Sequence, residues 1–150
     1  MNLQKVDSQR DLLDWTLEQE RELFSDGALN SWSLVPLAQT QILILGFKKG
    51  VPVGYALLLQ DRGKPDFLYL FSFGIQKHLQ GQGLGAELGE DLRAWTLKNG
   101  YSGWTLTVSQ DNLGARVLYK NLGKVEEETL LQAHYGKGED RLWWKLSFVA

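Results

Sequence analysis

Residues 80–85 read Gln-Gly-Gln-Gly-Leu-Gly; they follow a long apolar run, residues 67–75, and precede an amphipathic stretch that opens at Ala86. A backbone without β-carbons can bring successive N–H groups close to one anion, often with positive φ angles. The start of a helix adds unpaired N–H groups and a partial positive charge. The pattern predicts a strand, an anion-binding turn and a helix, and it favours a diphosphate as the ligand.

Three glycines in a loop are also typical of a tight strand-to-helix turn without a ligand. If the loop does bind a nucleotide, the neighbouring residues decide which of the known nucleotide-binding motifs it fits. A P-loop requires Lys and then Ser or Thr after its last glycine, whereas Ala86 and Glu87 follow here. The spacing of Gly81, Gly83 and Ala86 satisfies the loose dinucleotide pattern, but residues 103–107 contain no carboxylate that could hold a ribose. The remaining candidate is another diphosphate carrier, such as coenzyme A.

Length and composition indicate one globular domain over residues 1–150, because 43% of the residues are hydrophobic and 23% are charged. A net charge of -2 without a Lys/Arg run argues against nucleic acid as a partner. Without cysteine, and with only His78 and His134 as isolated histidines, we expect no metal. No apolar segment approaches the roughly 20 residues that span a bilayer, so we expect a cytoplasmic protein that does not bind membranes.

Hydrophobic periodicity predicts the elements of the first half of the chain. Apolar residues between Leu12 and Phe24 recur at helical spacing, with Asp7 and Ser8 available as caps. Residues 41–47 and 51–60 indicate an antiparallel hairpin. The run 67–75 is apolar on both faces, which is typical of a buried central strand.

The second half continues the pattern with a helix from Leu84 to Trp95 and a strand over residues 104–109. Asp111 or Asn112 can cap a helix that ends at Gly123, and residues 125–132 and 141–148 form a closing antiparallel pair. Strand, glycine loop, helix and strand make a βαβ unit with parallel strands. The predicted fold is α+β: a mixed, mostly antiparallel sheet flanked by helices, with one parallel βαβ unit at the glycine loop.

Two motifs in this order resemble the GNAT superfamily of acyl-CoA-dependent N-acyltransferases, over nearly the whole chain. Residues 80–85 are similar to the family's Gln/Arg-x-x-Gly-x-Gly/Ala loop, which binds the CoA diphosphate. Residues 112–123 are similar to its Asn-x-x-Ala-x-x-Leu-Tyr-x-x-x-Gly segment. Within the superfamily, residues 133–144 resemble the tail of the ribosomal-protein alanine (RimI-type) acetyltransferases. The resemblance implies the fold of that family.

The resemblance also implies acetyl-CoA as the acyl donor, no metal, and an amine as the acceptor, in a monomer or homodimer. It implies that Tyr119 protonates the departing CoA thiolate. Asn112 has a simpler alternative role as a helix cap. The residues that it implies for cofactor binding are Phe73, Ile75, Gln80, Gly81, Gln82, Gly83, Leu84, Gly85, Ala86, Asn112 and Ala115.

The general base is where the chain departs from this pattern. RimI-type enzymes carry Leu-Glu-Val on the strand after the glycine-loop helix, with the glutamate as base, whereas residues 106–108 read Leu-Thr-Val. No acidic residue occurs in the run 67–75 either. Histidine titrates near neutral pH, so His134 is a candidate to take the amine's proton, with a surface residue as the alternative. The glutamates 126–128 are expected on a solvated strand edge, and the six tryptophans mainly in the core.

We therefore expect direct transfer of an acetyl group from acetyl-CoA to a primary amine, which suits a chain without a cysteine nucleophile. Among acceptors, a protein or peptide N-terminal α-amine is favoured over a small amine such as a polyamine or an aminoglycoside. An acyl-CoA-binding module without turnover is the alternative from another class. The acceptor and the length of the acyl chain are left open by the sequence.

Overall fold

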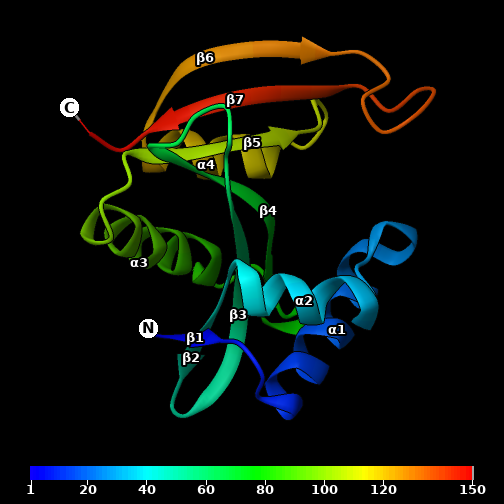
Figure 1. Ribbon diagram of the computed structural model, residues 1–150, viewed down its shortest axis with the longest axis vertical. Coiled ribbons are helices and arrows are strands. Elements are labelled where there is room, and N and C mark those ends of the chain that lie inside the picture. The colour runs from blue at the N-terminus through cyan, green and yellow to red at the C-terminus, as the bar shows by residue number, and fades with distance from the viewer. Residues whose placement is uncertain (150) are drawn as a thin grey trace. The chain divides into compact units, whose positions relative to one another are not determined.

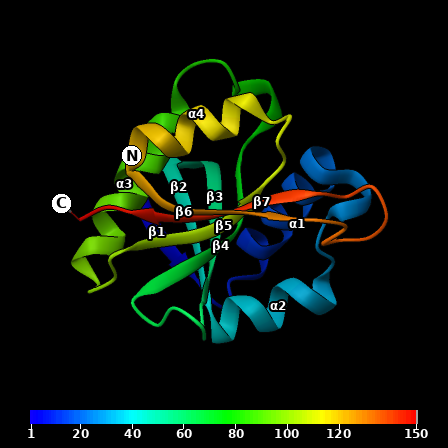
Figure 2. The ribbon, with the colours of Figure 1, turned by 90° about the horizontal axis from the view of Figure 1, so that it is seen from above.

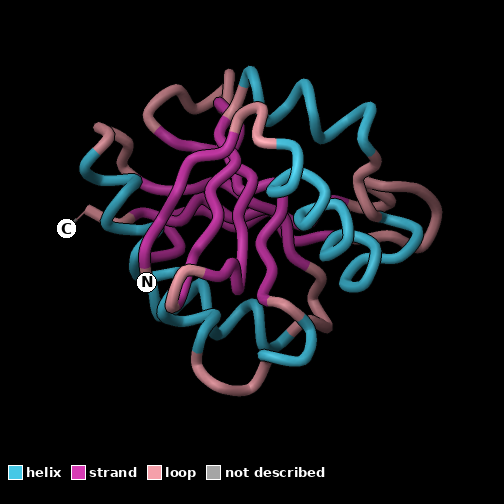
Figure 3. Tube along the Cα trace, turned by 90° about the horizontal axis from the view of Figure 1, so that it is seen from below, coloured by secondary structure: helices cyan, strands magenta, loops and turns pink. Residues whose placement is uncertain are grey.

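The computed structural model describes residues 1–149, which form two compact units. The first unit contains Met1–Leu59 and Phe71–Asp91, and the second contains Gln60–Leu70 and the chain from Leu92 onward. Figure 1 follows the chain through both units, and Figure 3 distinguishes their helices, strands and loops. Among the described residues, no helix has the length and apolar character needed to cross a membrane.

Three antiparallel strands form the sheet of the first unit: β1 (Asn2–Val6), β2 (Ile42–Lys48) and β3 (Val51–Gln60). In β2 and β3, Leu43 lies opposite Leu57 and Ile44 opposite Ala56. The turn between them uses Lys49 and Gly50, both at positive φ, as a two-residue hairpin requires. The predicted hairpin is confirmed, whereas β1 was not predicted because its residues are mostly polar and exposed.

Two helices and one short 3-10 turn follow β1 and precede β2: α1 (Arg10–Phe24), η1 (Ser25–Gly27) and α2 (Ser31–Thr40). Gln9 is the N-cap of α1 and makes no side-chain cap bond, so the predicted capping by Asp7 or Ser8 is wrong. The Asn30 side chain caps α2 by accepting a hydrogen bond from Ser33 N. Leu13, Leu17 and Leu34 of these helices are buried with residues of β1, β2 and β3.

The rest of the first unit consists of the end of β4 (Phe67–Ile75), η2 (Lys77–Leu79), the glycine loop and the start of α3 (Leu84–Lys98). Figure 2 shows α1 and α2 on one face of this unit's strands and α3 on the other. The close approaches at its glycines agree with this view, since a Cβ on Gly74 would meet Leu23 and one on Gly46 would meet Leu88. The sheet is therefore covered on both faces.

In the second unit, β5 (Gly103–Val108) pairs with the start of β4 in parallel, with Leu68 opposite Trp104. Next to β5 lie β7 (Arg141–Ser147) and then β6 (Lys124–Leu131), both antiparallel to their neighbours. The helix α4 (Leu113–Leu122) connects β5 to β6. Trp104 and Trp144 are fully buried in this unit, and Trp104 Nε1 donates to Thr96 Oγ1 at 2.9 Å.

The hydrogen-bonded strand order is β1-β2-β3-β4-β5-β7-β6, and the pairing of β4 with β5 is parallel. This confirms the predicted α+β fold with a mixed, mostly antiparallel sheet and one parallel βαβ unit at the glycine loop. β6 is an edge strand, and Glu126, Glu127 and Glu128 are exposed on it, as predicted. Trp143 is half-buried and Trp144 buried, in keeping with their opposite faces.

Two predictions of burial are wrong. The strand β4 is buried on the face of Leu68, Leu70, Ser72 and Gly74, but 45% of Phe71 on the other face is exposed. In the first unit, Ser72 of the buried face donates to Glu20 of α1, and Gly74 lies against Leu23 of the same helix. Trp32 is 89% exposed, because it precedes the buried stripe of Leu34 and Ala38 on α2. The helix α2 was not predicted from periodicity, and Trp32 is an exception to the expectation that the tryptophans lie mainly in the core.

Candidate active site

The glycine loop of the first unit has the backbone that its sequence predicts. Gly81 and Gly83 both lie at a φ of +81°, which side chains with a β-carbon rarely adopt, and both face open space. The side chain of Gln80 donates through Nε2 to Ile75 O at 3.1 Å and fixes the loop to the end of β4. The helix α3 then begins at Leu84, so its first N–H groups lie directly after the glycines. This is the geometry that anion binding requires.

Charges near the loop fit an anionic ligand. Lys77 and His78 lie in η2, just before the loop, and both are exposed. Glu87, in the first turn of α3, is paired with Lys48 at 2.8 Å, and this contact holds the pKa of the Glu87 carboxyl below its usual range. The negative charge of Glu87, near the start of the helix, is thus balanced by the positive charge of Lys48. Local charge does not oppose a diphosphate here.

The strand residues predicted for the cofactor differ in exposure. Ile75 is 6% exposed and lies against Gly54 and Gly85, so its side chain belongs to the core of the first unit. Phe73 is half-exposed on the same face of β4. Only backbone atoms of Ile75, or the side chain of Phe73, can therefore contact a ligand. The loop residues Gln80, Gly81, Gln82, Gly83 and Ala86 are exposed, and Leu84 and Gly85 are partly exposed.

The other predicted motif lies on α4 in the second unit. Asn112 Oδ1 accepts a hydrogen bond from Ala115 N at 3.1 Å, so the predicted capping role of Asn112 is confirmed. Tyr119 is half-buried two turns later on the same helix. Burial raises the pKa of Tyr119 to about 12, against the opposing effect of the positive charge of Arg141. The phenol therefore keeps its proton at neutral pH, as an acid must.

Two tyrosines, one threonine and one arginine meet around Thr107 of β5; we call Tyr69, Thr107, Tyr135 and Arg141 the hydroxyl cluster. The hydroxyl oxygen of Tyr135 lies 3.4 Å from that of Tyr69 and 3.4 Å from that of Thr107. Arg141 donates through Nε to Thr107 Oγ1 at 3.3 Å and through Nη2 to Thr107 O at 3.0 Å. The partners of Thr107 in these contacts are a phenol and a guanidinium, and neither is a carboxylate.

His134 lies in the exposed turn between β6 and β7. Its ring packs edge-on against that of Tyr135, with the centroids 4.7 Å apart. Sequence reasoning did not assign a role to Tyr69, Tyr135 or Arg141. The period-two pattern of β4 and β7 places Tyr69 and Arg141 on definite faces, but it does not say which faces meet.

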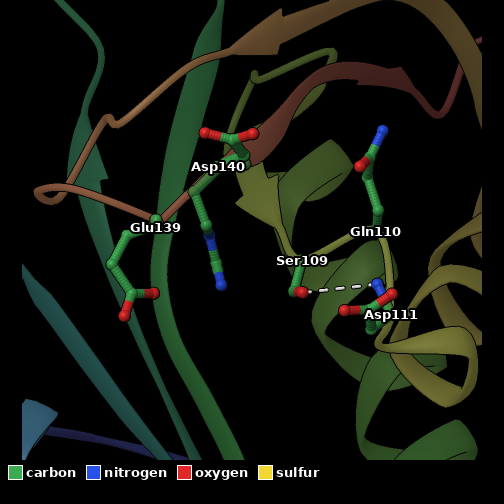
Figure 4. A pocket seen from close by; sticks show the side chains of 7 residues that line it. Ser109, Gln110, Asp111, Glu139 and Asp140 are labelled. Carbon is green, nitrogen blue, oxygen red and sulfur yellow. Dashed lines mark hydrogen bonds between the residues drawn. The ribbon is translucent and has the colours of Figure 1, made fainter.

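A cavity of about 310 Å³ opens beside the hydroxyl cluster in the second unit. Figure 4 shows Ser109, Gln110 and Asp111 on one side of it and Glu139 and Asp140 on the other. Arg141 also lines the cavity while it binds Thr107. Asp140 accepts a hydrogen bond from Ala133 N at 2.8 Å, which ties the wall of the cavity to the turn that carries Tyr135. Three carboxylates against one arginine leave the lining net negative.

The family follows from the match of these motifs. The family model described as the acetyltransferase (GNAT) family matches residues 9–123, most of the chain and both motifs. The chain belongs to the GNAT family of acetyltransferases. This confirms the resemblance on which the cofactor and acid residues were predicted.

Solved structures share the fold at low sequence identity. The ribosomal-protein-S18-alanine N-acetyltransferase from Escherichia coli is 22% identical, with a TM-score of 0.77 over 99% of this chain and 94% of that one. The aminoglycoside 6'-N-acetyltransferase from Enterococcus faecium is 14% identical, with a TM-score of 0.77 over 100% and 98%. An aminoglycoside 6'-N-acetyltransferase complexed with coenzyme A is also 14% identical, with a TM-score of 0.78 over 100% and 98%. No curated protein matches the chain by sequence.

Proposed function

We propose that the protein transfers an acetyl group from acetyl-CoA directly to a primary amine. The observation that carries this proposal is the turn of Gly81 and Gly83, at positive φ, immediately before the first N–H groups of α3 in a chain of the GNAT family. Those N–H groups bind the CoA diphosphate, with Lys77 and His78 as nearby basic residues. Phe73 and Ile75, at the end of β4, orient the thioester. Asn112 and Ala115 of α4 are the remaining proposed cofactor-binding residues.

In the proposed reaction the neutral amine nitrogen attacks the thioester carbonyl, and the carbon–sulfur bond then breaks. The CoA thiolate leaves with a proton from Tyr119, and the acceptor nitrogen loses one proton to a base. The raised pKa of Tyr119, about 12, keeps the acid protonated over the whole physiological range. No covalent intermediate on the protein is needed, which agrees with the lack of cysteine.

For the acceptor we propose a protein or peptide N-terminal α-amine. The contacts of Thr107 with Tyr135 and Arg141 support this choice, since they supply no carboxylate base strong enough to favour lysine. The likeness to the ribosomal-protein-S18-alanine acetyltransferase is in keeping with it at the level of fold. We propose the same cytoplasmic setting for the enzyme, in a single domain as a monomer or homodimer.

A polycationic small molecule is the second candidate, and the cavity beside the hydroxyl cluster is the observation that favours it. Its carboxylates, Asp111, Glu139 and Asp140, offer a surplus of negative charge to the further ammonium groups of a polyamine or an aminoglycoside. Aminoglycoside acetyltransferases share the fold. The same carboxylates would also attract a peptide acceptor that carries a basic residue.

The test is release of free CoA from acetyl-CoA, followed with a thiol reagent, in the presence of a panel of amines. The panel contains peptides with a free amino terminus, amino-terminally blocked peptides that carry lysine, polyamines and aminoglycosides. We expect the fastest release with a free amino terminus. Binding of acetyl-CoA without CoA release for any amine would instead indicate a binding module.

A further inference from the structure

The guanidinium of Arg141, at the start of β7, is held along one edge only. Nε donates to Thr107 Oγ1 at 3.3 Å, and Nη2 donates to Thr107 O at 3.0 Å. The group also lies over the Tyr135 ring, 5.8 Å from its centroid. A guanidinium carries five N–H donors and no acceptor. The two contacts with Thr107 therefore fix the group and leave three donors, on Nη1 and Nη2, for another partner.

Opposite charges line the cavity beside this guanidinium without pairing. Arg141 shares the cavity wall with Asp111, Glu139 and Asp140. Figure 4 shows Asp111 on one side and the other two carboxylates opposite. Within residues 1–149, no salt bridge joins the guanidinium to any of the three. The volume of about 310 Å³ is at the lower end of the ~300–1,000 Å³ typical of small-ligand pockets, so the free donors face a space that a ligand can enter.

The guanidinium is also close to the residue proposed as the acid. Burial raises the pKa of Tyr119 and of Tyr69, and in both phenols the positive charge of Arg141 acts against this rise. Such an effect needs a short distance, because charges in a solvated protein are screened over about 10 Å. An acceptor amine that reacts beside Tyr119 therefore brings its neighbouring groups toward Arg141.

The charges of the cavity discriminate among the groups that can follow an acceptor amine. A guanidinium repels an ammonium group, so the further nitrogens of a polyamine are unfavourable partners for Arg141. A free carboxylate would pair with the guanidinium, but it would meet three negative charges on the same wall. A neutral carbonyl oxygen accepts from the guanidinium without either repulsion. The carbonyl next to the α-amine of a peptide meets these conditions.

We propose that Arg141 binds the carbonyl oxygen of the acceptor's first residue and thereby selects peptides over amines that lack this carbonyl. This assignment rests on the proposed function. The free donors on Nη1 and Nη2 bind the oxygen, while the other edge of the guanidinium stays on Thr107. Arg141 determines specificity and transfers no proton. Polyamines and aminoglycosides have no carbonyl next to the reacting amine, and free amino acids present a carboxylate there, so all three should be poorer acceptors.

The experiment compares two acceptors at pH 10, where most α-amines are neutral and the guanidinium keeps its charge. One is a lysine-free peptide with a free amino terminus. The other is the same peptide with its first amide replaced by a trans alkene, which keeps the shape and the amine but lacks the carbonyl oxygen. Release of CoA gives kcat/KM for both acceptors. The preference for the amide is the ratio of the two values, and we expect it to be about tenfold in the wild type, as for a hydrogen bond to a charged group.

The variants are Arg141→Met, which removes the donors, and Tyr135→Phe, which changes the hydroxyl cluster but keeps the guanidinium. Arg62→Met, a change of an exposed arginine outside the cavity, is the matched control. We expect Arg141→Met to lose the preference for the amide and the other two variants to keep it. A merely structural role of Arg141 would lower both rates by the same factor and leave the preference unchanged.

The same preference in Arg141→Met and in the wild type would overturn the assignment. So would a wild-type enzyme without any preference, a comparison that does not depend on the stability of a variant. Faster acetylation of alanine than of alaninamide would show that the guanidinium binds a carboxylate instead. Each of these results leaves the proposed function intact. A wild-type protein that binds acetyl-CoA but releases CoA with no amine would overturn the proposed function and this assignment with it.

Discussion

Glu20 of α1 and Ser72 of β4 are joined by a hydrogen bond of 2.6 Å from Ser72 Oγ to Glu20 Oε2, in the core of the first unit. The same carboxylate accepts from the Tyr55 hydroxyl and, through Oε1, from Leu29 N at 3.0 Å. Glu20 is 2% exposed. Burial, and then the carboxylate beside it, raise the pKa of Tyr55, so Tyr55 stays a donor. One carboxylate therefore ties α1, β3, β4 and the loop before α2 together.

Removal of this carboxylate should cost stability. In Glu20→Ala the buried donors of Tyr55, Ser72 and Leu29 lose their acceptor, and each unsatisfied buried group costs about 1 to 3 kcal/mol. We expect the free energy of unfolding in urea to fall by roughly 3 kcal/mol or more. Glu18→Ala, an exposed change on the same helix, is the control and should stay within about 0.5 kcal/mol of the wild type. Equal effects of the two changes would contradict the role of the network.

Binding of acetyl-CoA should depend on the glycine loop. Ligand at 100 times its dissociation constant stabilises the folded protein by about 2.7 kcal/mol, which raises the melting temperature measurably. Gly83→Asp should abolish that rise, because it puts a β-carbon at a φ of +81° and a negative charge at the diphosphate. Gly50→Asp is the matched control, since Gly50 has a φ of +78° and equally open space. The control should melt earlier yet keep the acetyl-CoA shift; a shift kept by Gly83→Asp would refute the loop assignment.

Tyr119→Phe should separate catalysis from cofactor binding. The hydroxyl is proposed to act as the thiolate departs, so turnover should fall while the affinity for acetyl-CoA stays within a few-fold. The measurement is CoA release together with the thermal shift, from pH 6 to 10. An unchanged turnover at every pH would mean that water or another group is the acid.

Stability at high pH should also report on Tyr119. Its folded-state pKa of about 12 lies above the ordinary value of 10.0, so the folded state holds the proton more tightly. The resulting stabilisation is complete below pH 10 and is lost as the pH rises toward 12. We expect the free energy of unfolding to fall less steeply over this range in Tyr119→Phe than in the wild type. Tyr101→Phe is the comparison, and an equal slope in wild type and Tyr119→Phe would contradict the raised pKa.

The acceptor preference follows from the cost of making a neutral amine. An α-amine with a pKa near 8 is roughly 10% deprotonated at pH 7, whereas a lysine near 10.4 is below about 0.1%. The costs are about 1.4 and about 4.6 kcal/mol, so without a carboxylate base the α-amine reacts more easily. Peptides with a free amino terminus should be acetylated faster than blocked peptides with lysine, and His134→Ala should cost less than Tyr119→Phe. Preference for the lysine peptide at pH 7 would show that a strong base is present.

Much of the fold is encoded locally, and the sequence predicts it for that reason. The glycines of residues 80–85 permit the positive φ angles that the loop uses, and Lys48-Lys49-Gly50 supplies the turn between β2 and β3. Asn112 caps α4 through a contact three residues away. Such signals depend on neighbours in the chain, so the hairpin, the βαβ unit and the family motifs can all be predicted without the tertiary structure. The sequence alone therefore determined the fold class and the conformation of the glycine loop.

The tertiary structure decided what depends on distant contacts. β1 is a strand only because its mostly exposed, polar residues pair with β2 some 40 positions later, for example Gln4 with Leu45. The Tyr69–Tyr135 and Thr107–Tyr135 contacts bridge 66 and 28 positions, and Glu20 meets Ser72 across 52. Periodicity assigns each of these side chains to a face of its element. The packing of the whole unit decides which faces meet. Long-range contacts form only when the free energy of burial offsets the entropy that is lost on closing the chain between them.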